Sequence, residues 1–390
     1  MKTVFRFVGL SMLLAAFLAV GSTAAIAQDA CEDYDANAEL DAKVRENYEN
    51  NETVGVAIEA GKQYIAKFGN CPVFEDFTNW VKGQMPEWEK RKKAYDEWLW
   101  LKPRTERFDA GVRDKKYDDA YAAGKEILAK YPDNMNIMVP LGVIGLYASY
   151  DKNYKHNEDT IRFAQMAIAK LKAGTKATKK NPAGLDVYGV FQHELTKEQA
   201  ISEMTYALGY INFWVKNDKK SALPYYYEVS QLEGPYKNEP RVYVTIGEYY
   251  LEQAANLGKE IATLVQNQKL SFETDSEEVR DQKEATIKGK IALFNGYTER
   301  AMDALSRAYK VAPATTPEQK KYRDSIYTQL QTVFEQRFEK KEGLDTWISS
   351  TIAKPMPNPT SNVEPVIDPE TETETETSTS TTGGTAMARP

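Results

Sequence analysis

The chain has 390 residues, with 57 acidic and 50 basic side chains, a formal net charge of -7, two cysteines and 42% apolar residues. This composition excludes a collagen-like chain, a disulfide-rich miniprotein and a chain that is disordered throughout. It is typical of a soluble protein large enough to form a substantial core. The negative net charge also argues against binding to nucleic acid, which we do not expect among the partners.

Residues 1–27 have the features of a signal peptide. Lys2 and Arg6 supply positive charge, an apolar run covers residues 7–20, and residues 25–27 read Ala-Ile-Ala, the small-x-small form of a cleavage site. The residues before the first cysteine lack the Leu-x-x pattern of lipoproteins. We therefore expect a secreted or periplasmic protein with a bacterial-type signal peptide, no lipobox, and no stable membrane span after cleavage. The alternative interpretation is an uncleaved anchor helix.

Export would give the two cysteines a structural role. In an oxidising compartment Cys31 and Cys71 form an even pair and are the candidate disulfide. Such a bond would close a loop of about 41 residues and stabilise the fold by about 4 kcal/mol on the chain-entropy estimate. The alternative is two unpaired thiols.

The composition changes near Pro355. Prolines recur there, and residues 371–382 then alternate threonine with glutamate and serine. Such a stretch lacks the apolar side chains that offset the entropy lost on ordering. We therefore predict a disordered, solvated, Pro/Thr/Glu-rich tail over residues 355–390. Its serine and threonine content would also suit a glycosylated tether.

Residues 28–354 are predicted to be an all-α domain, because apolar residues recur at spacings of three and four without a convincing period of two. Two connections, 173–195 and 267–276, are longer or more polar than helix pairs require, and each is either an ordinary insertion or a binding loop. The predicted helices are 36–49, 52–68, 73–101 with a break at Pro86, 116–130, 135–150, 157–172, 196–215, 219–232, 240–266, 277–294, 297–311, 317–339 and 342–353.

The chain also resembles itself. Residues 57–68 and 120–131 are identical at six of twelve positions, and residues 301–313 form a third, weaker copy. The small residues of these copies fall on one helical face, where a neighbouring helix must approach closely, and a proline follows the second and third copies. The residues predicted to pack between repeats on this pattern are Ala57, Gly61, Ala120, Gly124, Pro132, Ala301, Ala308 and Pro313.

One part of the chain carries both halves of a known pattern. Tyr243-x-x-Ile246-Gly247-x-x-Tyr250 and Ala301-x-x-x-Leu305-x-x-Ala308 are separated by Asn295-Gly296-Tyr297, which is expected to be the turn between two helices. Here the sequence resembles the tetratricopeptide repeat family. The resemblance implies a superhelical stack of antiparallel helix pairs, an α-solenoid, with Tyr243, Gly247 and Tyr250 packing between helices. It also implies that the concave face binds a protein or peptide partner.

No catalytic, cofactor-binding or metal-binding residues are predicted. His193-Glu194 begins like a zinc-protease motif, but Lys197 stands where the second histidine belongs. Asp33-x-Asp35-x-Asn37 begins like a calcium loop but lacks the required glycine and glutamate. Nucleophile-elbow and phosphate-loop motifs are missing. We expect a protein that is not an enzyme, with no cofactor, and with both histidines in surface or capping roles.

Four of the six tryptophans lie within residues 80–101. Core packing is the simple interpretation of this cluster. The alternative is that Trp98 or Trp100 presents an aromatic surface to a ligand, since exposed aromatic residues anchor interfaces.

Together these features predict an exported, non-enzymatic scaffold that binds a protein or peptide on the concave face of a helical solenoid. The alternative is a glycan or small-ligand binding protein that uses exposed tryptophan and tyrosine side chains. An envelope spacer with the C-terminal tail as its tether is a further hypothesis. The sequence leaves open the identity of the partner, the oligomeric state and the modification of the tail.

Overall fold

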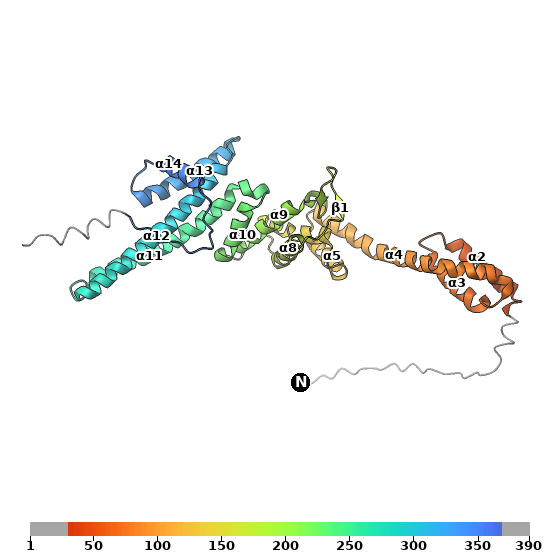
Figure 1. Ribbon diagram of the computed structural model, residues 1–390. Coiled ribbons are helices and arrows are strands. Elements are labelled where there is room, and N and C mark those ends of the chain that lie inside the picture. Colours follow the sequence, from red (N-terminus) through yellow and green to blue (C-terminus); the bar gives the residue numbers. More distant parts are fainter. Residues whose placement is uncertain (1–29, 369–390) are drawn as a thin grey trace, which may run out of the picture. The chain divides into compact units, whose positions relative to one another are not determined.

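A computed structural model describes residues 30–368 of the chain (Figure 1). The predicted signal peptide and residues 369–390 of the predicted tail lie outside these residues. Within the described part the chain is helical almost throughout, which confirms the all-α prediction. The only strands there are the two-residue pair β1 (Lys179–Lys180) and β2 (Asp186–Val187), which run antiparallel.

The described residues fall into two compact units that meet at Pro103 in the chain. The boundary lies inside a continuous helix, α4 (Glu75–Arg113). Before it, the smaller unit contains α2 (Tyr34–Asn47), α3 (Val54–Phe68) and the short η1 (Pro72–Phe74). The larger unit contains α5 (Tyr117–Lys130), α6 (Met135–Leu141), α7 (Ile144–Tyr150), α8 (Asn157–Lys172), η2 (Phe191–His193), α9 (Lys197–Tyr210), η3 (Ile211–Val215), α10 (Lys219–Gln231), η4 (Pro235–Asn238), α11 (Pro240–Ser271), α12 (Glu277–Val311), α13 (Pro317–Phe338) and α14 (Leu344–Ile352).

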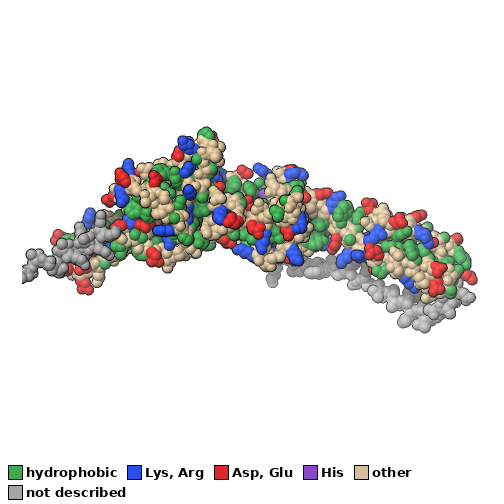
Figure 2. Space-filling model, turned by 45° about the horizontal axis from the view of Figure 1, so that its top comes forward, with side chains coloured by type: hydrophobic (Ala, Val, Ile, Leu, Met, Phe, Trp, Pro, Cys, Tyr) green, Lys and Arg blue, Asp and Glu red, His purple; other side chains and the backbone are tan. Residues whose placement is uncertain are grey.

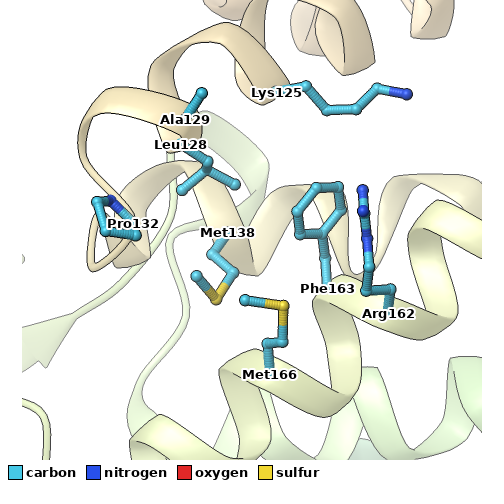
Figure 3. A pocket seen from close by; sticks show the side chains of 8 residues that line it. All are labelled: Lys125, Leu128, Ala129, Pro132, Met138, Arg162, Phe163 and Met166. Carbon is cyan, nitrogen blue, oxygen red and sulfur yellow. The ribbon is translucent and has the colours of Figure 1, made fainter.

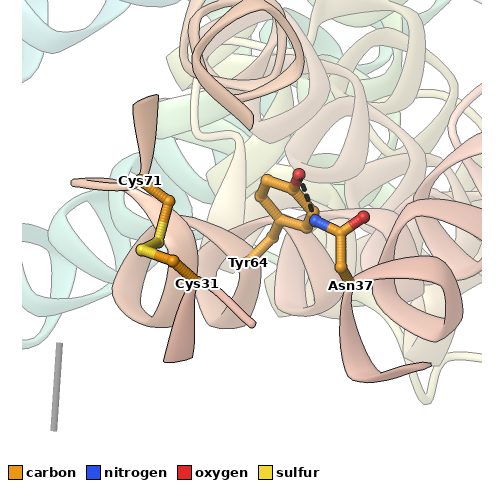
Figure 4. The surroundings of a disulfide bond; sticks show 4 residues. All are labelled: Cys31, Asn37, Tyr64 and Cys71. Carbon is orange, nitrogen blue, oxygen red and sulfur yellow. Dashed lines mark hydrogen bonds between the residues drawn. A yellow bond between two sulfur atoms is a disulfide. The ribbon is translucent and has the colours of Figure 1, made fainter. Parts of the chain in front are cut away.

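In the smaller unit a disulfide closes the first helix pair (Figure 4). Cys31 precedes α2 and Cys71 follows α3, and the two residues form the expected bond with their Cα atoms 5.5 Å apart. Beside the disulfide, the side-chain amide of Asn37 donates a hydrogen bond of 2.6 Å to the hydroxyl oxygen of Tyr64. The disulfide therefore links the start of α2 to the end of α3.

The predicted break at Pro86 is wrong, because α4 continues through this proline. Val81 and Trp88, on either side of it, are almost fully buried in one cluster with Ile58 of α3. A proline inside a helix removes one backbone hydrogen bond. The apolar packing on both sides of Pro86 holds the helix together despite this loss.

In the larger unit, most helices contact the next helix in the chain, while α6 also contacts α8 and α12 also contacts α14. Contacts join α8 to α9, α9 to α10, α10 to α11, α11 to α12, and α12 to α13. One cluster of buried side chains extends from Leu146 of α7 to Ile348 of α14. The connection at 173–195 is structured, since β1 and β2 pair within it and Tyr188 forms a bridge with Leu195.

Two predictions about the C-terminal part are also wrong. Residues 295–297 are not a turn, because α12 is a single helix from Glu277 to Val311. The first part of the predicted solvated tail, up to Asp368, is packed on the larger unit: Met356 is buried, and the amide of Val366 donates a hydrogen bond to the carbonyl of Ala292 in α12. The two findings are related, because Gly296 lies where this segment approaches the helix.

Most of the residues predicted to pack between repeats are buried. The small and aromatic residues among them are largely or fully shielded from solvent, whereas the two prolines are exposed just beyond helix ends. The buried set is Ala57, Gly61, Ala120, Gly124, Tyr243, Gly247, Tyr250, Ala301 and Ala308, and the exposed pair is Pro132 and Pro313.

Gly124 shows why a small residue is needed at such a position. A Cβ atom there would lie 2.8 Å from Cδ1 of Leu141 and 3.2 Å from the ring of Phe108. Both neighbours are fully buried or nearly so, and close-packed side chains have little room to move. The absence of a side chain thus sets the distance between α5 and its neighbours.

We predict that Gly124→Val destabilises the larger unit by about 1–3 kcal/mol, because the added methyl groups overpack this contact. Gly289→Val is the matched control, since a Cβ at Gly289 of α12 meets nothing within 4 Å. Urea unfolding followed by circular dichroism measures both variants. Equal effects at the two positions would contradict the packing argument.

Candidate binding surfaces

Trp98, one of the two predicted ligand-binding residues, is 48% exposed on α4. It borders an open hollow of about 440 Å³, whose other lining residues are Asn51, Arg91, Ala94 and Tyr95. The ring of Tyr95 stacks on it at 5.6 Å with an interplanar angle of 22°, and the ammonium of Lys102 lies 4.6 Å from its centre. Trp100, the second candidate, is only partly exposed and does not line this hollow.

Arg91, the cation that lines this hollow, already has hydrogen-bond partners. Arg91 donates hydrogen bonds to the carbonyls of Tyr48 and Glu49, at 2.8 and 2.7 Å, and to the side-chain oxygen of Asn51. These bonds fix the loop between α2 and α3 against α4. Arg91 is therefore already paired, and the hollow offers the aromatic face of Trp98, beside which the Lys102 ammonium lies.

A cluster of tyrosines in the larger unit is the second candidate surface. We define the tyrosine cluster as Tyr147 and Tyr150 of α7, Tyr206 and Tyr210 of α9, and Tyr236 of η4. The rings of Tyr206 and Tyr236 stack at 4.0 Å, and those of Tyr150 and Tyr210 meet edge to face at 5.0 Å. Tyr150 is 45% exposed. Of the other members, Tyr206 is buried and Tyr147, Tyr210 and Tyr236 are half-buried.

A carboxyl group lies among these rings. The hydroxyl of Tyr236 donates a hydrogen bond of 2.7 Å to the carboxylate of Glu203 in α9. Burial raises the pKa of Glu203, and burial also raises the pKa of Tyr147 to about 12. The tyrosine hydroxyls therefore stay protonated at neutral pH and keep their capacity to donate hydrogen bonds.

His193 lies beside the same cluster, with its ring centre 5.5 Å from that of Tyr147. The expected surface or capping role is wrong for this histidine, which is only 5% exposed. His156 is also buried, where its Nε2 pairs with a carboxylate oxygen of Asp118 at 2.6 Å and its ring stacks on Tyr121. Both histidines therefore belong to the packing of the larger unit.

An apolar pocket of about 290 Å³ lies between α5, α6 and α8 (Figure 3). Lys125 and Arg162 stand at its polar edge, and both pair with Asp159, at 2.6 and 2.7 Å. This pairing offsets part of the positive charge, so the pocket suits a small apolar group. Its apolar lining consists of Leu128, Ala129, Pro132, Met138, Phe163 and Met166.

Acidic and basic side chains are interspersed on the face shown in Figure 2. Over residues 30–368 no group of three or more histidine, cysteine, aspartate or glutamate side chains could hold a metal ion. In the same residues no helix is both long enough and apolar enough to cross a bilayer.

No family model, no curated protein and no solved structure matches this chain. The resemblance to tetratricopeptide repeats therefore stays a prediction from the motifs themselves.

Sequence reasoning identified Trp98 but not the tyrosine cluster. The cluster gathers side chains from α7, α9 and η4; α8 and η2 lie between α7 and α9 in the chain, and η3 and α10 lie between α9 and η4. The only sequence feature that pointed toward this cluster was the high total of 24 tyrosines. It gave no indication of which tyrosines would meet.

We predict that His193 makes the larger unit less stable as the pH falls. Burial lowers the pKa of His193 from 6.5 to about 4, so between these values the unfolded chain binds a proton that the folded chain does not. The contribution of His193 to the free energy of unfolding is fully present above pH 6.5. It decreases by about 3 kcal/mol as the pH falls toward 4. His193→Phe keeps a ring beside Tyr147 and removes the titration. Urea unfolding at several pH values should show a shallower loss in the variant, and identical pH profiles would contradict the assignment.

Proposed function

We propose that the protein is an exported, non-enzymatic scaffold that binds a protein or peptide partner through its larger helical unit. The observation that carries this proposal is the tyrosine cluster, in which the half-buried ring of Tyr210 meets the exposed ring of Tyr150 edge to face. Tyrosine supplies a large contact area, a hydrogen-bonding hydroxyl and few rotatable bonds, so it loses little entropy when it binds. Such residues are enriched among those that dominate binding energy.

The arrangement of the helices supports a repeat-like frame for this surface. The helices contact their neighbours in sequence, and the small residues shared by the sequence copies are buried between them. We propose that the larger unit is a tetratricopeptide-like solenoid. In such a stack each helix pair buries the apolar face of the previous pair, and side chains of successive pairs line a continuous binding surface.

Two features support the proposed location outside the cytoplasm. Residues 1–27 carry the sequence features of a signal peptide. The Cys31–Cys71 disulfide is compatible with an oxidising compartment, where such bonds persist. We propose a secreted or periplasmic protein on these two grounds.

The partner should be lost when the tyrosine cluster is removed. We predict that affinity purification with the full chain from its native envelope fraction recovers a specific protein, and that Tyr150→Ala with Tyr210→Ala reduces its recovery by at least about tenfold, the cost of a hot-spot residue. Tyr34→Ala is the control, because Tyr34 is 61% exposed in the smaller unit. Equal recovery by both variants, or no specific protein in several salt concentrations, would overturn the proposal.

A second function, glycan binding, is favoured by one observation. Trp98 and Tyr95 stack as a platform at the edge of an open hollow, and flat aromatic faces suit the apolar faces of sugar rings. In this proposal the smaller unit carries the ligand site.

A glycan array tests this second function. If it is correct, the full chain binds a defined set of glycans, and Trp98→Ala weakens that binding by about tenfold through loss of stacking. Leu99→Ala should leave binding unchanged, because the adjacent Leu99 is equally exposed but does not line the hollow. No bound glycan, or binding that survives Trp98→Ala, would exclude this function.

A further inference from the structure

The C-terminal segment, residues 354–368, is held on the larger unit by contacts at both ends. Near its start the guanidinium of Arg307 donates a hydrogen bond of 2.8 Å to the carbonyl of Lys354, and the side chain of Met356 enters the main core cluster. Farther along, Val363 packs on the same cluster. From Asn362 to Asp368 the segment contains neither helix nor strand.

Helix α12 satisfies both main-chain polar groups of Val366. Its amide donates to the carbonyl of Ala292 at 2.8 Å, and its carbonyl accepts from the side-chain amide of Asn295 at 3.2 Å. Asn295 is buried beneath the segment at 7% exposure. Main-chain bonds of this kind recognise a chain by its backbone and leave the choice of side chains to neighbouring contacts.

Gly296 lets the backbone of the segment approach the helix. A Cβ at this position would lie 2.2 Å from the carbonyl oxygen of Glu364, which no rearrangement of a flexible side chain could relieve. A glycine inside a helix is unfavourable by about 1 kcal/mol relative to alanine. At Gly296 this unfavourable helix propensity is accompanied by the space that the backbone of the segment occupies.

A buried arginine binds the acidic residue at the end of the segment, Asp368. The side chain of Arg337 in α13 is 3% exposed and donates to both carboxylate oxygens of Asp368, at 3.1 and 2.8 Å. The same guanidinium donates to Glu299 of α12 at 2.8 Å. Such two-point contacts between arginine and a carboxylate combine strength with geometric selectivity.

The shared arginine lowers the electrostatic cost of releasing the segment. If Asp368 left, Arg337 would keep Glu299 as its partner and no buried charge would remain unpaired. An unpaired buried charge is the main cost of breaking such contacts, and this site avoids it. The carboxylate of Asp368 is itself 49% exposed and returns readily to water.

We propose that the surface formed by Ala292, Asn295, Gly296 and Arg337 is a binding site for a short, linear, acidic peptide, with the protein's own C-terminal segment as its built-in occupant. A partner peptide that carries an apolar residue five positions before a carboxylate, as Val363 stands before Asp368, displaces that segment. This site is separate from the tyrosine cluster, so its test does not depend on the proposed function above.

The test uses a fluorescein-labelled peptide with the sequence of residues 359–368 and the full-length chain. Val363→Ala with Asp368→Ala removes the side chain that packs on the core and the carboxylate that binds Arg337, and so weakens the built-in segment, which otherwise competes at a high effective concentration. Fluorescence anisotropy should show that this double variant binds the peptide at least about tenfold more tightly than the unaltered chain does. Equal affinity for the two chains would overturn the proposal.

Two glycine variants in the double-variant background distinguish this site from nonspecific binding. Gly296→Ala should abolish binding, because its Cβ occupies the position of the peptide carbonyl. Gly289→Ala lies in the same helix, where a Cβ meets nothing within 4 Å, and should leave binding unchanged. Both substitutions favour the helix, so loss of folding is not expected, and circular dichroism checks this. Peptide binding that survives Gly296→Ala would contradict the assigned site.

Discussion

The larger unit depends on the close approach of helices that follow one another in the chain. An amphipathic helix cannot bury its apolar face alone, so each helix relies on its neighbours for the stability that propensity does not provide. Small residues such as Gly124 and Ala120 allow that approach, and the large side chains opposite them fill the core. The rest of the unit, including the surfaces proposed to bind ligands, is positioned by these contacts.

The binding surfaces use the same frame in two different ways. In the tyrosine cluster, side chains of α7, α9 and η4 pack on one another, and the half-buried ring of Tyr210 orients the ring of Tyr150. On α12 and α13 the frame instead presents polar groups, Asn295 and Arg337, to a segment without secondary structure. The tyrosine cluster thus offers contact area, and the surface on α12 and α13 offers directed hydrogen bonds. Both gain selectivity from groups held in place before a ligand arrives.

The sequence predicted the positions of most helices and the burial of the small residues, because both follow from local spacing. It failed where a distant contact decides the local structure. Asn295-Gly296 looks like a turn, yet the glycine accommodates residues 363–364, which lie more than sixty positions away. Pro86 looks like a helix break, but packing of Val81 and Trp88 outweighs it. The tail composition predicted a solvated chain over its whole length, yet core contacts of Met356 and hydrogen bonds to α12 and α13 hold its first part.

In the larger unit, each helix is stabilised mainly by packing against the helices next to it in the chain. Native-state hydrogen exchange of the Gly124→Val variant tests this most directly, because it reports the opening free energy of each helix separately. Our account predicts the largest decrease in protection in α5, α6 and α8, a smaller one in α9, and almost none in α13. An equal decrease across all of these helices would show one globally cooperative core and contradict the account.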